Sequence, residues 1–217
     1  MLKLKTEDRD IWFTADTHYM HKNIVRGESD WEDLSGCRPF ETKEEMNAEI
    51  VDGINKYVKK DDILFFLGDW SFGGFDNIEE FRKQLDVDTI HFILGNHDHH
   101  VLNDKNGIRS LFTSVENYRF IDIDGQGMAL CHYPIISWER AYRHAWMIHG
   151  HTHNMLPHKD TIQWSGDKYW LATGKMFDIG MDSAYANFGE YRPFKFQELK
   201  EILKDRAYEF VDKERVS

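Results

Sequence analysis

One hexapeptide, GNHDHH at residues 95–100, concentrates groups that can bind a metal ion or move a proton. Its asparagine and aspartate offer oxygen donors, and its histidines offer imidazole nitrogens that titrate near neutral pH. The hexapeptide directly follows the apolar run IHFIL, which has the length and composition of a buried strand. Polar side chains at the end of a buried strand are typical of a ligand site in an α/β protein.

Four further apolar runs end in the same kinds of side chain. Asp16 and His18 follow IWFTA, Asp69 follows ILFFLG, His132 follows MALC, and His151 and His153 follow AWMIHG. Imidazole and carboxylate donors without thiolate suit divalent ions such as Mn²⁺, Fe²⁺ or Zn²⁺. An aspartate can bridge two ions because it has two oxygens, and two ions about 3.5–4 Å apart can clamp a phosphate during in-line displacement.

The elements between these clusters predict how the clusters meet. Strands and helices alternate in the order strand 11–15, helix 43–58, strand 61–70, helix 77–85 and strand 89–98. Thr42 and Glu45 match a capping box at the start of the first helix. This alternation favours parallel strands joined by right-handed crossovers, so that the polar strand ends share one edge of a sheet.

The second half of the chain predicts further strands with short helices. We expect a hairpin of 114–124 and 127–134 around the turn DGQG, a short helix at 137–144, strands at 145–154 and 176–182, and a C-terminal helix at 196–210. The turn-rich stretch 154–170 is interpreted as a loop or lid, whose Trp164, Tyr169 and Trp170 would meet a base or an apolar leaving group. No linker or repeat divides the chain, so residues 1–217 are predicted to form one domain.

Composition restricts the partners. The net charge is −11, from 27 basic and 38 acidic side chains, so a basic surface for long nucleic acid is disfavoured. The charged N-terminus has no apolar leader core, and no run of about 18 apolar residues predicts a membrane span. Cys37 and Cys131 are expected to be free thiols in a reducing compartment, so we expect a cytoplasmic protein. The oligomeric state stays open.

The ordered motifs DTH, GDW, GNHD, CHYP and GHTH resemble those of the calcineurin-like metallophosphoesterase superfamily. DTHYMHKNI (16–24) and RPF (38–40) further resemble small bacterial and phage phosphoesterases. The motifs run from residue 16 to 153, and FDIGMD resembles the strand that closes the second sheet of this family. The resemblance implies an α/β fold, a four-layer α/β/β/α sandwich of two mixed sheets flanked by helices.

The resemblance also implies a metal role for seven residues. Asp16, His18 and His153 would hold one divalent ion, Asn96, His132 and His151 would hold a second, and Asp69 would bridge both. Mn²⁺ is the preferred ion, with Fe, Zn, Ni and Mg as alternatives. No ligand expected from the motifs is missing from the sequence.

Further residues receive catalytic or substrate roles by the same resemblance. His97 would stabilise the transition-state charge and protonate the leaving oxygen, and Asp98 would hold His97 in the required tautomer. His21, Asn23 and Arg38 are candidates for binding the substrate phosphate. The alternatives are loop capping for His21 and Asn23 and an ion pair with a carboxylate for Arg38.

These roles imply a dinuclear metal-dependent phosphoesterase in which a metal-bridging hydroxide attacks a phosphodiester or a phosphomonoester. A small, nucleotide-like substrate is preferred because the chain is acidic. A nuclease acting on DNA or RNA ends, and a non-catalytic metal-binding interaction module on the same fold, are the alternatives. The retention of His97 and of every ligand favours an enzyme.

Overall fold

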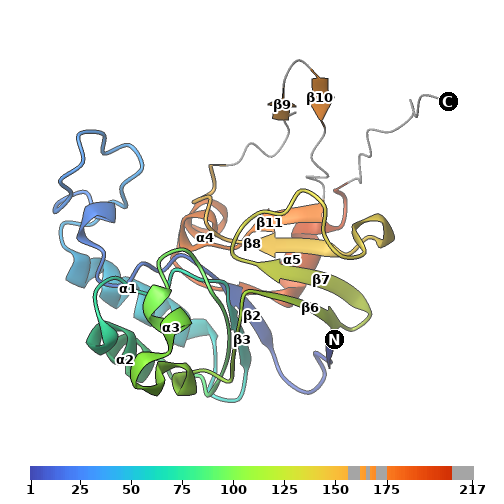
Figure 1. Cartoon of the computed structure of the whole chain (residues 1–217), viewed down its shortest axis with the longest axis horizontal. Helices are drawn as coiled ribbons and strands as arrows, with labels where there is room; N and C mark the ends of the chain where they lie inside the picture. The colour runs from blue at the N-terminus through green and yellow to red at the C-terminus, as the bar shows by residue number, and fades with distance from the viewer. Residues whose placement is uncertain (156–161, 165–166, 170–174, 207–217) are drawn as a thin grey trace.

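Two five-stranded mixed sheets lie face to face at the centre of the computed structural model, which describes residues 1–155, 162–164, 167–169 and 175–206 (Figure 1). The first sheet has the order β12 (Phe194–Lys195), β2 (Ile11–Thr14), β3 (Ile63–Phe66), β4 (Thr89–Ile93) and β5 (Ser114–Glu116). The second has the order β1 (Leu2–Leu4), β6 (Tyr118–Ile123), β7 (Gln126–Cys131), β8 (Trp146–His149) and β11 (Met176–Asp178).

Helices flank the sheets. The α-helices are α1 (Lys43–Tyr57), α2 (Phe75–Gln84), α3 (His99–Asn103), α4 (Met181–Phe188) and α5 (Phe196–Leu203). Three 3-10 helices, η1 (Lys22–Ile24), η2 (Lys105–Leu111) and η3 (Ala141–Arg143), lie in the connections. Since α1 and α2 connect parallel neighbours, β2, β3 and β4, the predicted crossover units are confirmed.

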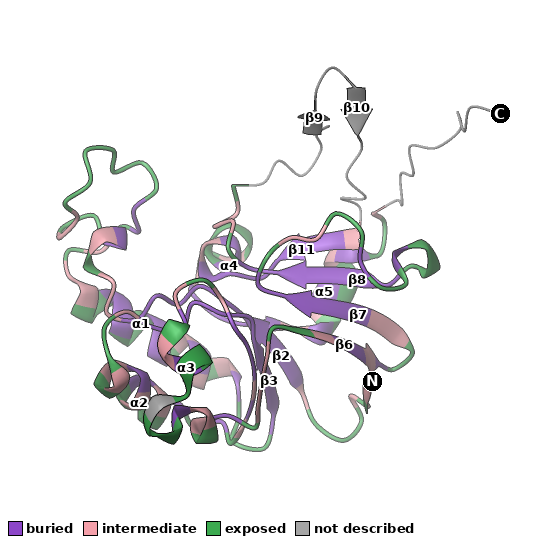
Figure 2. Ribbon diagram, viewed as in Figure 1, coloured by how far each residue is buried: buried purple, intermediate pink, exposed green. Residues whose placement is uncertain are grey.

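Side-chain alternation along the strands of the first sheet builds two apolar layers. Leu64 and Phe66 of β3 face outward and pack with Met46 and Ile50 of α1. Phe65, between them in sequence, faces inward into the core that the two sheets share. Figure 2 shows buried residues concentrated along these strands. The sequences of these strands are continuous apolar runs because both faces of this sheet are covered.

The start of α1 is fixed by the capping residues that the sequence predicted. The Thr42 hydroxyl accepts the Glu45 backbone N–H at 3.2 Å, and the Glu45 carboxylate accepts the Thr42 backbone N–H at 3.3 Å. The predicted capping box is therefore present. On the outer face of the second sheet, Ala129 and Met147 pack against Trp138 and Ala141. Two mixed sheets flanked by helices confirm the predicted fold class.

Several element boundaries differ from the prediction. The stretch 114–124 is two strands, because β5 pairs with β4 in the first sheet and β6 begins the second sheet after Asn117. Only 141–143 of the helix predicted at 137–144 is helical, as a 3-10 turn. The N-terminal β1 adds a parallel strand beside β6, which the charged sequence of residues 1–10 did not predict.

Within the stretch interpreted as a loop or lid, β9 (Ile162–Trp164) and β10 (Asp167–Tyr169) pair antiparallel. Residues 156–161, 165–166 and 170–174 lie outside the described part of the chain, as do residues 207–217 of the predicted C-terminal helix. Cys37 and Cys131 are both buried and unpaired, as expected. Along the described residues, no helix combines the length and apolar character needed to cross a membrane.

Candidate metal centre

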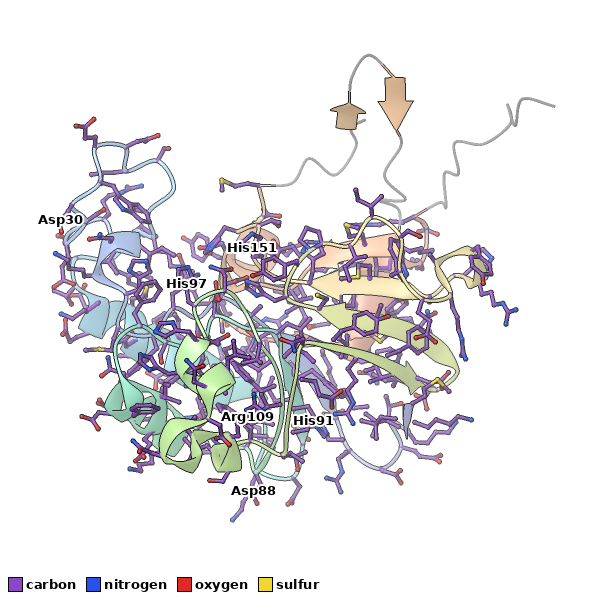
Figure 3. The ribbon with its side chains drawn as sticks, in the orientation of Figure 1. Asp30, Asp88, His91, His97, Arg109 and His151 are labelled. Atoms are coloured by element: carbon purple, nitrogen blue, oxygen red, sulfur yellow. The ribbon has the colours of Figure 1, made fainter. Side chains whose placement is uncertain are left out.

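The carboxyl ends of β2, β3 and β4 meet those of β7 and β8 where the two sheets adjoin. All seven predicted metal ligands come from the turns that directly follow these strands. Figure 3 labels His97 and His151, which lie at this junction although they follow strands of different sheets, β4 and β8. The convergence follows from topology, because parallel strands deliver their carboxyl ends to the same edge.

The first group of donors contains Asp16, His18 and His153, whose ligand atoms lie within 4.8 Å of one another. The Nε2 atoms of His18 and His153 face each other at 3.2 Å. His153 places Nδ1 2.7 Å from Oδ2 of Asp182, so that a proton on Nδ1 leaves the Nε2 lone pair directed at the group. Facing lone pairs at this distance are the arrangement expected around a shared cation.

The second group contains Asn96, His132 and His151. Oδ1 of Asn96 lies 3.0 Å from Nε2 of His132 and 2.9 Å from Nδ1 of His151. Nδ1 of His132 lies 2.8 Å from the carbonyl oxygen of Leu67, which accepts its proton and leaves Nε2 as the lone-pair donor. Three converging atoms thus come from three different strand ends.

Asp69 lies between the two groups. Its Oδ2 is 3.7 Å from Nε2 of His18 in the first group and 3.5 Å from Nε2 of His132 in the second. Its Oδ1 accepts the backbone N–H of His97 at 3.0 Å, which fixes the orientation of the carboxylate. A single carboxylate facing both donor sets is the geometry that a bridging ligand requires.

The donor atoms fit divalent cations. Neighbouring donors are 2.9–3.7 Å apart, and donors bound to one ion at about 2.1 Å lie about 3.0–3.4 Å apart in octahedral or tetrahedral geometry. Burial raises the pKa of Asp16 well above its ordinary value, and repulsion from Asp178 and Asp69 adds to that rise. Burial lowers the pKa of His132 to about 4. Crowded carboxylates beside neutral imidazoles are an environment that a cation would stabilise.

His97 stands at the open side of this centre. Its side chain is 41% exposed, and its Nε2 lies 4.0 Å from Oδ2 of Asp69. Its ring packs against Phe72 at a centroid distance of 4.6 Å. An accessible imidazole beside the donor groups is positioned to face a substrate.

Comparison with known proteins identifies the family. Residues 10–176 match the model of the calcineurin-like phosphoesterase superfamily domain. The chain belongs to this superfamily. It is 33% identical over 148 residues to the protein MJ1445 of Methanocaldococcus jannaschii, covering 67% of this chain and 70% of that protein. It is 26% identical over 176 residues to the Gene 66 protein of Mycobacterium phage D29, covering 68% and 80% of the two chains.

A solved structure supports the fold. The protein AQ665 from Aquifex aeolicus superposes with a TM-score of 0.58 at 19% identity, covering 89% of this chain and 99% of that chain. This likeness shows the architecture alone. Family membership makes the chain a metal-dependent phosphoric ester hydrolase, and the residue clusters described above are candidates to hold its metal ions.

The ligand-bearing turns of this phosphoesterase adopt an unusual backbone. Five of the candidate ligands have left-handed φ angles, which glycine adopts more readily than other residues. They are Asp16 (56°), His18 (49°), Asp69 (57°), His151 (70°) and His153 (47°). The left-handed conformation costs such residues roughly 1–2 kcal/mol each. Conformational strain of this kind clusters where a site needs side chains in fixed directions. The turns therefore present their donors inward at a cost to the free energy of folding.

Two glycines make room for the aspartate ligands. A β-carbon at position 95 would lie 2.3 Å from Oδ1 of Asp69, and one at position 180 would lie 2.5 Å from Oδ2 of Asp16. Both distances are far below a van der Waals contact. Gly95 and Gly180 are therefore required for the close approach of backbone to carboxylate.

The contacts of Asp98 differ from those that the predicted orienting role requires. Its Oδ2 accepts the backbone N–H groups of Asp69 and Gly95, each at 2.7 Å, and its Oδ1 accepts that of Trp70 at 3.0 Å. Among the described residues, it forms no hydrogen bond with the imidazole of His97. Asp98 instead ties the turn after β3 to the turn after β4, because both turns donate to one buried carboxylate.

The guanidinium of Arg38 is engaged with protein groups, as the ion-pair alternative predicts. Its side chain is 1% exposed and forms a bidentate ion pair with Asp182, at 2.9 and 2.8 Å. Its remaining N–H groups donate to the carbonyl oxygens of Asp16 and Thr17 and to the sulfur of Met46. All five donors of the guanidinium are occupied, which leaves none free for a substrate phosphate.

The other two substrate candidates differ from each other. His21 lines a cavity beside the centre and stacks on Phe72 at 3.6 Å between ring centroids. Asn23 uses its side-chain oxygen to accept the backbone N–H of Asp30 at 3.3 Å and does not line that cavity. The geometry therefore keeps His21 as a candidate and places Asn23 in the loop-capping role.

Sequence reasoning missed two carboxylates that support the ligands. Asp182 holds both His153 and Arg38, and Arg38 keeps the pKa of Asp182 well below its ordinary value although burial opposes ionisation. Asp178 accepts the hydroxyl of Thr152 at 2.5 Å and the backbone N–H of Asn154 at 2.9 Å, which fixes the turn carrying His153. The available signal was FDIGMD, an apolar strand followed by carboxylates, as in the other ligand clusters.

Proposed function

We propose that this phosphoesterase hydrolyses a small, nucleotide-like phosphate ester with two divalent cations held at the described centre. The observation that carries the proposal is the position of Asp69, whose Oδ2 faces both donor groups. Asp16, His18 and His153 would hold one cation, and Asn96, His132 and His151 would hold the other. Imidazole, carboxylate and amide donors favour Mn²⁺ or a similar borderline ion.

When bound, two such cations supply an activated water nucleophile at neutral pH and neutralise charge on the phosphate oxygens. The chain's own residues do the rest. His97, exposed beside Asp69, is positioned to donate a proton to the departing oxygen and to stabilise charge on the phosphoryl group. Asp182 and Leu67 fix the tautomers of His153 and His132 and hence the direction of their lone pairs.

The proposed size of the substrate rests on the adjoining cavity. It has a volume of about 670 Å³ and is lined by His18, His97 and His153 of the centre together with residues 24–39 and α4. Cavities of about 300–1,000 Å³ are typical of small-molecule sites. The net charge of −11 disfavours a long polyanion such as intact DNA or RNA.

The test is hydrolysis of bis(p-nitrophenyl) phosphate and p-nitrophenyl phosphate by purified protein with and without Mn²⁺. We expect Mn²⁺-dependent turnover that a chelator abolishes. His97→Ala should keep its bound metal and lose about 10²–10⁴-fold in kcat, whereas His99→Gln, an exposed control on α3, should resemble the wild type. A protein that binds Mn²⁺ but hydrolyses neither ester, nor any of a panel of nucleotides and oligonucleotide ends, would contradict the proposal.

A further inference from the structure

The cavity beside the candidate metal centre has an aromatic wall that includes His97, His21 and Trp31, and no catalytic role explains its outer members. Starting at His97, ring contacts continue to Phe72 (4.6 Å between centroids), from Phe72 to His21 (3.6 Å) and from His21 to Trp31 (6.0 Å). This series leads from the reacting region out to the loop that carries Trp31. That loop, residues 24–39, projects from the molecule beside α1 (Figure 1).

The exposure of the outer aromatic residues is unusual. Trp31 is 47% exposed and Tyr185 of α4 is 44% exposed, although both line the cavity. Tyr185 stacks on the buried ring of Tyr191 at 4.7 Å, so its orientation is fixed before any ligand binds. Large aromatic side chains left exposed around a concave site are typical of surfaces that bind a ligand.

A single unpaired cation adds to this wall. Arg26 lines the cavity and is exposed, and none of the described carboxylates forms an ion pair with it. Asp182, the carboxylate among the lining residues, is already neutralised by Arg38. Arg26 is therefore available for an anionic group of a ligand.

We infer that the cavity formed by residues 24–39 and α4 is the specificity pocket for the leaving group. It accepts a flat aromatic ring against Trp31 and Tyr185, and a second anionic substituent of that ring binds Arg26. The scissile phosphate lies at the other end, beside His97. The inference rests on the proposed function, because it assigns the leaving group of the same reaction.

Alkyl and aryl esters differ in intrinsic reactivity. The test therefore compares two alkyl esters whose leaving groups differ in the flatness of the ring. Benzyl phosphate and cyclohexylmethyl phosphate have leaving alcohols of similar acidity, but only benzyl is flat. Both are assayed as monoesters and as methyl diesters with Mn²⁺. We expect kcat/KM to favour the benzyl ester about tenfold, since base–aromatic stacking changes binding by about 1–3 kcal/mol. Trp31→Ala should remove most of this preference, and Trp31→Phe should restore it.

A second pair of substrates, benzyl phosphate and its para-carboxylate derivative, tests Arg26. A para-carboxylate on the benzyl ring should raise kcat/KM about three- to tenfold in the wild type, as a charge-assisted pair predicts. In Arg26→Gln this gain should fall to about one. Leu34→Ala, an exposed side chain of the same loop that does not line the cavity, is the control for Trp31. Lys3→Gln, on β1, is the charge-matched control for Arg26.

Binding gives a readout that does not depend on turnover. Titration calorimetry with benzylphosphonate and cyclohexylmethylphosphonate, which are not hydrolysed, should show the same ring preference and the same loss in Trp31→Ala. Equal affinity for the two phosphonates, or a preference that survives Trp31→Ala, would overturn the inference. Metal-dependent hydrolysis of both ring types without preference would also overturn it while leaving the proposed function intact. Absence of any hydrolysis would contradict the proposed function, and the phosphonate titrations would still decide the pocket.

Discussion

A single carboxylate, Asp182, connects the buried guanidinium of Arg38 to His153, a candidate metal ligand. It pairs with Arg38 through both oxygens and accepts the Nδ1 proton of His153 at 2.7 Å. Arg38 in turn donates to the carbonyl oxygens of the turn that carries Asp16 and His18. The first donor group is therefore positioned by one network of charge-assisted hydrogen bonds, in which each member fixes the next.

Asp182→Asn tests this network. We expect Mn²⁺ affinity to fall about 10–100-fold, because His153 loses the carboxylate that fixes its tautomer. The free energy of unfolding should fall by about 3 kcal/mol, because Arg38 keeps its charge in a buried position without an anionic partner. Calorimetric Mn²⁺ titration and urea unfolding measure the two effects. Glu190→Gln, which removes an exposed carboxylate paired with Lys56, is the control and should leave Mn²⁺ affinity unchanged; equal affinities in Asp182→Asn and wild type would rule out the network.

At the scale of the element, the site depends on tight turns after straight strands. The turns after β2, β3 and β8 contain residues with left-handed φ angles, and Gly95 and Gly180 stand where a side chain would collide with a carboxylate. These turns contain little regular structure of their own. They are held by Asp98, which binds backbone N–H groups from the turns after β3 and β4. The donors are consequently placed by backbone geometry as much as by their own packing.

Gly95→Ala tests the dependence on backbone space. The added β-carbon would meet Oδ1 of Asp69 at 2.3 Å, so either the carboxylate or the turn must move. We expect both cations to bind at least about tenfold more weakly, because Asp69 faces both donor groups. Gly74→Ala, where no atom lies within 4 Å of the added carbon, is the control. Normal Mn²⁺ stoichiometry and affinity in Gly95→Ala would show that the close approach is unnecessary.

A pH-sensitive side chain, His91 of β4, lies where β4 pairs with β5. Burial, followed by the charge of Arg119, lowers the pKa of His91 to about 4, below its ordinary value of about 6.5. The unfolded chain therefore takes up a proton between pH 6.5 and 4 that the folded chain does not. Stability present above pH 6.5 is lost as the pH falls through this range, by about 1–2 kcal/mol after screening by solvent.

His91→Gln should flatten this dependence. Unfolding by urea between pH 4 and 7, in chelator so that bound metal does not contribute, compares the variant with the wild type. The difference in unfolding free energy between the two should shrink as the pH falls. His99→Gln, an exposed histidine of α3, serves as the control. A difference that stays constant with pH would show that His91 does not change its proton uptake on folding.

Sequence patterns predicted the strand–helix alternation and the convergence of the candidate donors because these depend on short-range features. Apolar runs followed by Asp, Asn or His give both the strand and the donor at its end. The contacts of Arg38, Asn23 and Asp98 could not be predicted because each depends on which group lies nearby in space. Arg38 meets its partner Asp182 from 144 positions away, which no local pattern shows. The left-handed turns were also beyond prediction, since ligands rather than glycine occupy them.

The whole molecule brings two half-sites together. The first donor group combines β2 of the first sheet with the turn after β8 of the second, and the second group combines β4 with β7 and β8. The candidate metal centre therefore spans the interface between the sheets, next to the apolar core that they share. Cations bound there would link the sheets in addition to serving the reaction, and would stabilise the folded state in proportion to their affinity.

The proposed function requires that these separated side chains hold two cations around Asp69. Anomalous diffraction from crystals grown with MnCl₂ measures this directly. Two peaks about 3.5–4 Å apart are expected. One should lie among Asp16, His18 and His153 and the other among Asn96, His132 and His151, with Asp69 contacting both. A single peak, or peaks bound by other residues, would contradict the proposed function.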